Sequence, residues 1–178
     1  MSGKQLGLLK EIVPGRSRIA ISGIPGLNVA QFEAAQTAVE SVGIEVKIIE
    51  VQVADDFERA LEAARTKHVD AGILLSSPLV YGASKQIGEL AIAKRLTLIS
   101  LFAVFPQSGG LISYGPNVGE LFRRCGDYVA KILHGAKPSE LPIQRPERFE
   151  LVINLKTATA LGLDIPTQLQ QLANEVIE

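Results

Sequence analysis

Short hydroxyl and amide side chains, mixed with aromatic rings, are the residues of this sequence best placed to do chemistry. They gather in residues 22–28, 76–84, 100–105 and 114–117, each of which follows a short apolar run typical of a buried strand. A few polar groups among apolar and aromatic ones are the usual lining of a small-ligand pocket. The candidate ligand-binding residues are Ser22, Asn28, Ser76, Ser77, Tyr81, Ser100, Phe102, Tyr114 and Asn117.

Each of these residues also has an ordinary structural explanation. Ser and Asn cap helices, and Ser, Asn and Pro are common in turns. For any single residue this explanation is at least as good as a ligand contact. Taken together, the loops favour a pocket.

Candidates for catalysis and metal binding are missing from the sequence. His68 and His134 lie near the expected ends of helices, where a cation complements the helix dipole, and neither has a metal-ligand partner at suitable spacing. The run at 23–26 (GIPG) is not a dinucleotide fingerprint, and its proline lacks an N–H that a phosphate would need. No serine sits in a nucleophile elbow. We therefore expect no catalytic residue, metal or cofactor, and a protein that is not an enzyme.

Composition excludes further classes of function. The net charge is −1 and the basic residues are dispersed, which argues against a nucleic-acid partner. Apolar residues make up 47% of the chain, as in globular proteins, but no run approaches the roughly 20 residues of a membrane span. The single cysteine, Cys125, cannot form an intramolecular disulfide, and we expect it to be a buried structural thiol.

The elements that would position the candidate residues alternate between strand and helix patterns. Helices are expected over 2–13, from Asn28 to Gly43, from Asp55, and from Ser84. The expected strands between them are 18–22, 44–53, 71–75 and 97–101. Parallel strands need such helical crossovers and are buried on both faces. The predicted fold is a single α/β lobe over residues 1–178, a three-layer α-β-α sandwich with an open parallel sheet that binds ligands at the carboxyl ends of its strands.

Four of the expected helices start with a capping residue or pair. The pairs are Asn28 with Gln31, Asp55 with Glu58, and Asn117 with Glu120; Ser84 stands alone.

The second half of the sequence is less regular. It contains a short strand at 111–114, a helix at 117–133, a proline-punctuated stretch at 138–146 and a strand at 149–154, followed by two short helices. The apolar stripe of the long helix is Leu121, Cys125, Tyr128, Val129 and Ile132.

Several segments carry a specific resemblance to a known family. The most distinctive are 110–117 (GLISYGPN), 128–138 (YVAKILHGAKP) and 149–158 (FELVINLKTA), and the opening residues 2–15 also match. Together they resemble the ABC transporter substrate-binding protein family, which has the type I periplasmic-binding fold. The resemblance is to the C-terminal lobe alone, so the chain is expected to be truncated.

The resemblance implies a two-lobed protein that clamps a small molecule by hinge closure and delivers it to an ABC permease. It implies an amino-acid-like ligand and a periplasmic location. The sequence itself starts without a signal peptide and would be cytoplasmic if that start is genuine. In the full family, residues 111–137 belong to the other lobe. The loops depart from the family at Ile24, Leu27, Ser77 and Val104, which removes polar groups that would hold a charged ligand.

A consequence follows for the helix at 117–133. In the full fold its apolar stripe would cover the missing lobe, and in this chain it would face water. An exposed patch of that kind indicates an interface, and we expect a homodimer centred on this helix and residues 102–111. The alternative function is thus a stand-alone dimeric structural or regulatory domain without a transported ligand.

Overall fold

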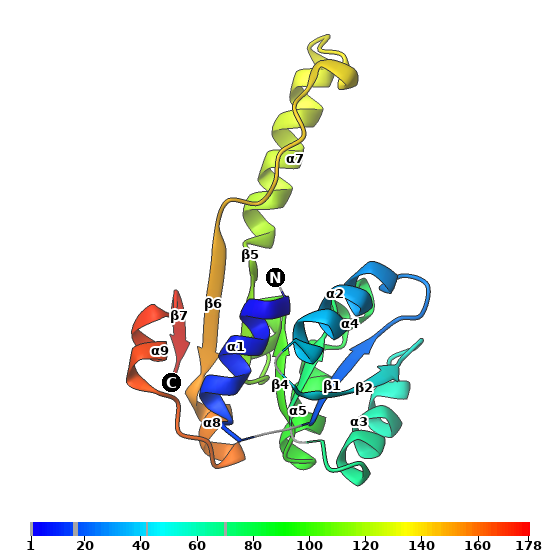
Figure 1. Cartoon of the computed structure of the whole chain (residues 1–178). Coiled ribbons are helices and arrows are strands. Elements are labelled where there is room, and N and C mark those ends of the chain that lie inside the picture. Colours follow the sequence, from blue (N-terminus) through cyan, green and yellow to red (C-terminus); the bar gives the residue numbers. More distant parts are fainter. Residues whose placement is uncertain (1, 16–17, 42, 70) are drawn as a thin grey trace.

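A seven-stranded sheet lies between two layers of helices in the computed structural model, which describes residues 2–15, 18–41, 43–69 and 71–178 (Figure 1). The strand order is β2-β1-β3-β4-β5-β6-β7. The strands are β1 (Arg18–Gly23), β2 (Glu45–Glu50), β3 (Ala71–Leu74), β4 (Thr97–Ser100), β5 (Ile112–Pro116), β6 (Phe149–Asn154) and β7 (Glu175–Ile177). The predicted α/β class with flanking helices is confirmed. β7 was not predicted.

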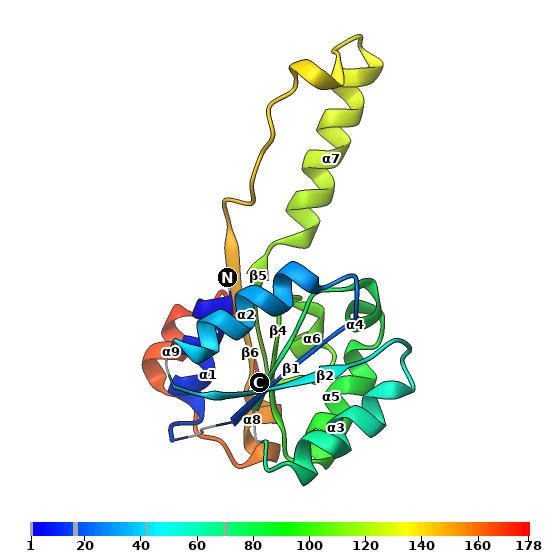
Figure 2. The same cartoon turned by 45° about the vertical axis from the view of Figure 1, so that its right-hand side comes forward.

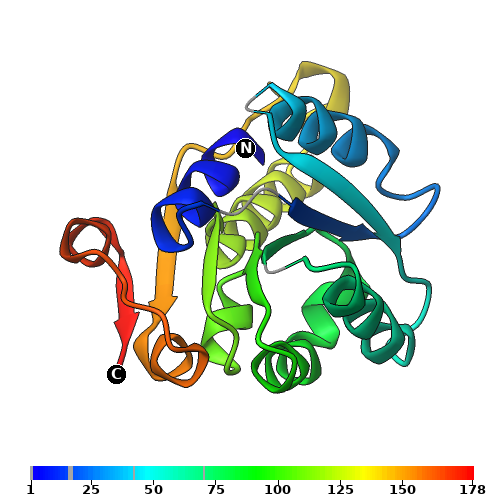
Figure 3. The same cartoon turned by 60° about the horizontal axis from the view of Figure 1, so that its bottom comes forward.

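Helices cover both faces of the sheet (Figure 3). One hydrophobic core contains residues of α1 (Ser2–Ile12), α2 (Val29–Glu40), α8 (Leu155–Leu161) and α9 (Thr167–Leu172). The other contains residues of α3 (Asp56–Thr66), α4 (Pro78–Gly82), α5 (Ser84–Ala93) and α6 (Val104–Gln107). The short helices α4 and α6 were not predicted.

Successive residues of the central strands enter opposite cores. Ile73 packs in the core of α1 and α2, whereas the next residue, Leu74, packs in the core of α3 and α5. Ile99 and Leu98 divide in the same way on β4. Side chains alternate along a strand, so a strand buried on both faces is apolar throughout. This is why the continuous apolar runs predicted these strands well.

The sheet is mixed, whereas an all-parallel sheet was predicted. β1 to β5 are parallel to their neighbours, but β6 runs antiparallel to β5, from Phe149 opposite Pro116 to Ile153 opposite Ile112. The reason lies in the connection. The chain leaves β5 through the long helix α7 (Val118–Leu133), returns beside it, and enters β6 from the same end of the sheet.

Residues 118–148 form an arm that stands away from the sheet (Figures 1 and 2). It consists of α7, a short 3-10 turn at Pro138–Glu140 and an extended return segment. No residue of the described helix α7 is buried, and Cys125 is exposed. The expectation of a buried thiol is therefore wrong, because the apolar stripe of α7 has only the return segment to pack against.

The helix caps expected at Asp55 and Ser84 are wrong. Asp55 makes no side-chain cap, and the Asp56 carboxylate accepts from the amides of Gln52 and Val53 instead. Ser84 is the first residue of α5, and its hydroxyl donates to the Val80 carbonyl at 2.9 Å.

Of the caps expected at Asn117, before α7, and at Asn28, before α2, only the first is observed. Asn117 is confirmed as the cap of α7, since its Oδ1 accepts from the Glu120 amide at 2.7 Å. Asn28 precedes α2 but makes no side-chain cap with it. That helix was expected to end at Gly43; α2 ends at Glu40, and Gly43 follows with a φ of +72°.

Glycine allows α5 to approach the chain that leads into β5. A Cβ on Gly88 would lie 2.8 Å from the Gly110 nitrogen and 2.9 Å from the Gly109 carbonyl carbon, closer than real side chains come. Gly126 offers a control, because it is also helical but a Cβ there meets nothing within 4 Å.

We predict opposite effects of the same substitution at these two positions. Gly88→Ala should lower the free energy of unfolding by about 1–3 kcal/mol, because the backbone must shift to admit the methyl group. Gly126→Ala should raise it by about 0.5–1 kcal/mol, through better helix propensity. Urea unfolding measures both. Equal shifts in the two variants would contradict the packing of α5 described here.

Candidate functional site

The carboxyl ends of β1, β3, β4 and β5 meet at the end of the sheet where the arm begins. The loops there enclose a hollow of about 460 Å³, which we call the strand-end pocket. The loops after β3 and β4 and the first turns of α7 contribute to it. Its lining residues are Ser76, Ser77, Pro78, Tyr81, Phe102, Val118 and Phe122.

Local hydrogen bonds fix the loop after β3. The Ser77 hydroxyl caps α4 by accepting from the Val80 amide at 3.1 Å, and Pro78 begins that helix with the backbone angle it requires. The amide and the hydroxyl of Ser76 both donate to Gln31 Oε1 at 3.0 Å. Gln31 therefore holds the pocket loop from α2 instead of closing a capping pair.

Asn28 joins the loop after β1 to the loop after β3 through two hydrogen bonds. It is completely buried; its Oδ1 accepts from the Ile24 amide at 2.7 Å and its Nδ2 donates to the Ser76 carbonyl at 2.9 Å. Asn28 thus positions the pocket wall instead of lining it.

Aromatic side chains form much of the wall. The rings of Tyr81 and Phe102 pack edge to face, with centroids 5.3 Å apart and an interplanar angle of 87°. Phe102 is held by the buried Ser100, whose hydroxyl accepts from the Phe102 amide at 3.2 Å. Tyr81 remains 47% exposed, and Phe122, on α7, is 72% exposed. Among the described residues that line the pocket, none is charged.

The other sequence candidates lie elsewhere. Ser22 is buried in the sheet on the side of α3, and its hydroxyl has no partner within the described part of the chain. Tyr114 stacks on Phe149 with centroids 5.8 Å apart. Asn117 donates to Glu150 at 2.6 Å as well as capping α7. Tyr114 and Asn117 therefore stabilise the base of the arm.

Of the sequence candidates, Ser76, Ser77, Tyr81 and Phe102 line this pocket, whereas the contribution of the arm was not predicted. Val118 and Phe122 are four residues apart and so lie on one face of α7. Their position directly after the Asn117 cap was the available signal, since it places them at the end of β5 with the other loops.

A smaller hollow of about 310 Å³ adjoins the pocket at Ser76. It lies between α1, α2 and the strand ends, and Gln5 of α1, which lines it, donates to the Tyr114 carbonyl at 3.1 Å. Its lining residues are Ser2, Gln5, Ala30, Gln31, Ala34, Leu74, Leu75, Ser76 and Leu101. The amide side chains of Gln5 and Gln31 are the polar groups of this hollow, together with Ser2 and Ser76.

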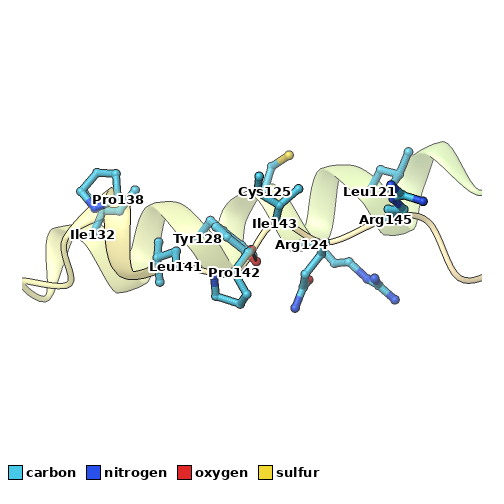
Figure 4. A pocket seen from close by; sticks show the side chains of 11 residues that line it. Leu121, Arg124, Cys125, Tyr128, Ile132, Pro138, Leu141, Pro142, Ile143 and Arg145 are labelled. Carbon is cyan, nitrogen blue, oxygen red and sulfur yellow. Dashed lines mark hydrogen bonds between the residues drawn. The ribbon is translucent and has the colours of Figure 1, made fainter.

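A third hollow, of about 660 Å³, runs along the arm between α7 and the return segment; we call it the arm groove (Figure 4). Its lining is mostly apolar: Leu121, Arg124, Cys125, Tyr128, Ile132, Pro138, Leu141, Pro142, Ile143, Gln144 and Arg145.

Polar contacts join the two sides of the arm groove. The Tyr128 hydroxyl donates to the Pro142 carbonyl. Arg124 donates to Glu120 at 2.9 Å and lies 3.5 Å from Glu147; the hydrogen bond to Glu120 and the charge of Glu147 raise the pKa of this guanidinium above its usual value. The contacts with Pro142 and Glu147 hold the return segment beside α7 but leave the apolar stripe of α7 uncovered.

The described part of the chain contains neither a cluster of metal ligands nor a membrane-spanning helix. Across residues 2–15, 18–41, 43–69 and 71–178, no group of His, Cys, Asp and Glu side chains could hold a metal ion. No helix in these ranges has the length and apolar character needed to cross a membrane. His134 follows α7, and its ring nitrogen lies 2.7 Å from the Ala130 carbonyl, in keeping with the expected place at a helix end.

Comparison with known proteins gives one family and a set of related structures. The family model described as ABC transporter substrate binding protein matches residues 2–177. No curated protein sequence matches the chain.

Solved structures match the chain over nearly its whole length. A conserved domain protein from Vibrio cholerae O1 biovar El Tor is 25% identical with a TM-score of 0.91, over 98% of this chain and 60% of that one. The ABC domain from Streptococcus pneumoniae in complex with L-Trp is 22% identical with a TM-score of 0.90, over 99% and 60%. A 5-methylthioribose transporter solute-binding protein from Thermotoga lettingae is 17% identical with a TM-score of 0.61, over 96% and 62%. The chain thus spans about three-fifths of the length of these proteins.

Removing the Asn28 side chain should loosen the pocket. Asn28→Ala leaves the Ile24 amide and the Ser76 carbonyl without partners, which should cost about 1–3 kcal/mol of the free energy of unfolding. Hydrogen exchange at the Ile24 amide should accelerate as well. Gln36→Ala on the exposed side of α2 is the control and should change stability by less than about 0.5 kcal/mol. Unchanged exchange at Ile24 would disprove the positioning role of Asn28.

Proposed function

The chain belongs to the ABC transporter substrate-binding protein family, and from this premise we propose that the strand-end pocket is its half of a ligand site. Proteins of this family bind substrates and do not convert them. The observation that carries the proposal is the convergence of Ser76, Ser77, Tyr81 and Phe102 at the carboxyl edge of the sheet, the edge where open α/β folds bind ligands.

The remaining half of the site would come from a second lobe. The related structures are longer than this chain by about two-fifths of their own length, and their fold includes the counterpart of nearly every residue present here. The arm at residues 118–148 leaves the sheet beside the pocket and would reach that lobe. In this proposal, residues 111–137 are shared between the two lobes: β5 belongs to the present sheet, and α7 packs against the second lobe. Hinge closure would then bury the ligand.

We propose a small, amino-acid-like ligand, delivered to an ABC permease in the periplasm. The Streptococcus pneumoniae structure holds L-Trp, while the Thermotoga lettingae protein binds 5-methylthioribose, so the shared fold accepts different small molecules. A hollow of about 460 Å³ suits a ligand of that size.

A thermal-shift screen against amino acids and other small metabolites tests this function. A ligand present at a hundredfold excess over its Kd should stabilise the native chain by about 2.7 kcal/mol and raise Tm accordingly. Tyr81→Ala should remove the shift. Tyr128→Ala, which changes the arm groove instead, should keep it. A shift that survives Tyr81→Ala would place the ligand outside the strand-end pocket.

A second candidate function is self-association of this chain through the arm groove. The accessible surface is 9801 Å², whereas a folded monomer of 19.1 kDa is expected to expose about 8,400 Å². The excess exceeds the roughly 800 Å² that each partner buries in a standard interface. We propose that a second copy covers this excess, giving a homodimer that could act as a structural or regulatory domain without a transported ligand.

Sedimentation of the purified chain at micromolar concentration tests the homodimer. Ile143 lines the groove and is 97% exposed, so Ile143→Lys should give a monomer without loss of folding. Ile48→Lys, on the edge strand β2, is the matched control and should leave the dimer intact. A monomeric parent chain, or a dimer that tolerates Ile143→Lys, would rule out this arrangement.

A further inference from the structure

We infer that two copies of this chain pack their α7 helices antiparallel, so that the arm of each copy reaches the strand-end pocket of the other. This inference rests on the proposed self-association and specifies its geometry. The first step is a second apolar face of α7, which we call the outer stripe. Its members recur every three or four residues and so lie on one side of the helix: Val118, Phe122, Gly126, Val129 and Leu133.

The outer stripe is exposed along most of its length. Phe122 is 72% exposed and Leu133 is 81% exposed, and the face of α7 beside them is the one that lines the arm groove. A row of large exposed apolar side chains indicates a packing partner. A Cβ on Gly126 meets nothing within 4 Å, so the middle of the stripe is a shallow place where a second helix can approach closely.

The two edges of the outer stripe decide which way the second helix runs. One edge is the apolar lining of the arm groove, with Leu121, Cys125 and Ile143. The other edge carries Arg123 and Asp127, both exposed. In an antiparallel pair related by a twofold axis each edge faces its own copy, whereas in a parallel pair it faces the opposite edge. Only the antiparallel pair therefore sets apolar side chains against apolar ones and keeps the charges away from them.

Charge also favours a second copy of this chain over another partner. Under the twofold axis Arg123 of each copy lies near Asp127 of the other, because both residues flank the middle of α7 on the same edge. Each charge thus meets its opposite, in the self-complementary way that a symmetric interface requires. The exposed surface in excess of a compact monomer is large enough for such an interface.

The crossing point determines which residues meet. Gly126 lies at the middle of α7, and a crossing there places Leu133 of each copy next to Val118 and Phe122 of the other. Val118 and Phe122 line the strand-end pocket together with the exposed Tyr81. The second copy therefore adds Leu133 to the wall of this pocket, which is complete only in the dimer.

Disulfide formation between purified full chains tests this arrangement. Both chains carry Cys125→Ser, and Val118→Cys and Leu133→Cys are introduced separately. The antiparallel pair brings these two positions together but holds the two copies of Leu133 about 20 Å apart, at about 1.5 Å per residue, beyond the roughly 7 Å that a disulfide spans between Cα atoms. A disulfide-linked dimer should form when the two variants are mixed and oxidised, and in neither variant alone.

A second measurement locates the interface on α7. Val129→Lys places a charge in the outer stripe, and the Kd of the dimer measured by sedimentation should rise about tenfold or more. Lys131→Glu changes the charge on the polar side of the same helix, where the side chain is exposed, and should leave the Kd unchanged. Circular dichroism with unchanged helix content shows that each variant is folded.

The remaining outcomes distinguish the inference from the proposed self-association. A disulfide in Leu133→Cys alone reports a parallel pair and overturns the inference, and so does the absence of a disulfide from the mixture. A dimer that survives Val129→Lys but is lost in Ile143→Lys has its interface in the arm groove alone, which overturns the inference and keeps the self-association. A parent chain that sediments as a monomer overturns both.

Discussion

A parallel ladder can continue only if each strand returns through a crossover, and this constraint shapes the rest of the molecule. Because β1, β3, β4 and β5 all point the same way, their carboxyl ends meet at one edge, and the loops that follow are neighbours without being near in sequence. Helices must then cover both faces, which leaves that edge as the place where loops can form a hollow. Asn28 completes the arrangement by joining the loop after β1 to the loop after β3.

The part of the fold that follows this constraint could be predicted from the sequence. The runs at 71–75 and 97–101 are buried on both faces and mostly apolar, and they correspond to β3 and β4 within a residue. The strand predicted at 149–154 is β6, but its antiparallel direction could not be predicted in the same way. Its direction depends on the arm folding back along itself, and the proline-rich return segment carries no periodic signal for that turn.

The candidate residues that line the pocket were predicted from the loops that follow β3 and β4. Ser76 and Ser77 come two or three residues after β3, so strand position alone placed them at the pocket. The capping pattern at Asn28 and Gln31 misled for a physical reason. Both side chains could serve the helix, but the buried loop after β3 has backbone groups with no other partner, and burial makes those bonds more valuable than an exposed cap.

The helix α7 joins the two hollows that give this chain its possible roles. Val118 and Phe122 turn toward the strand-end pocket, while Leu121, Cys125 and Tyr128 line the arm groove. One helix carries both sets, so a partner that covers the groove also fixes the wall of the pocket. A ligand that packed on Phe122 and a partner that covered the groove would contact the same helix, so the two proposed interactions would be linked through α7 and any coupling free energy would be reciprocal, whether the partner is a second lobe or a second copy of the chain.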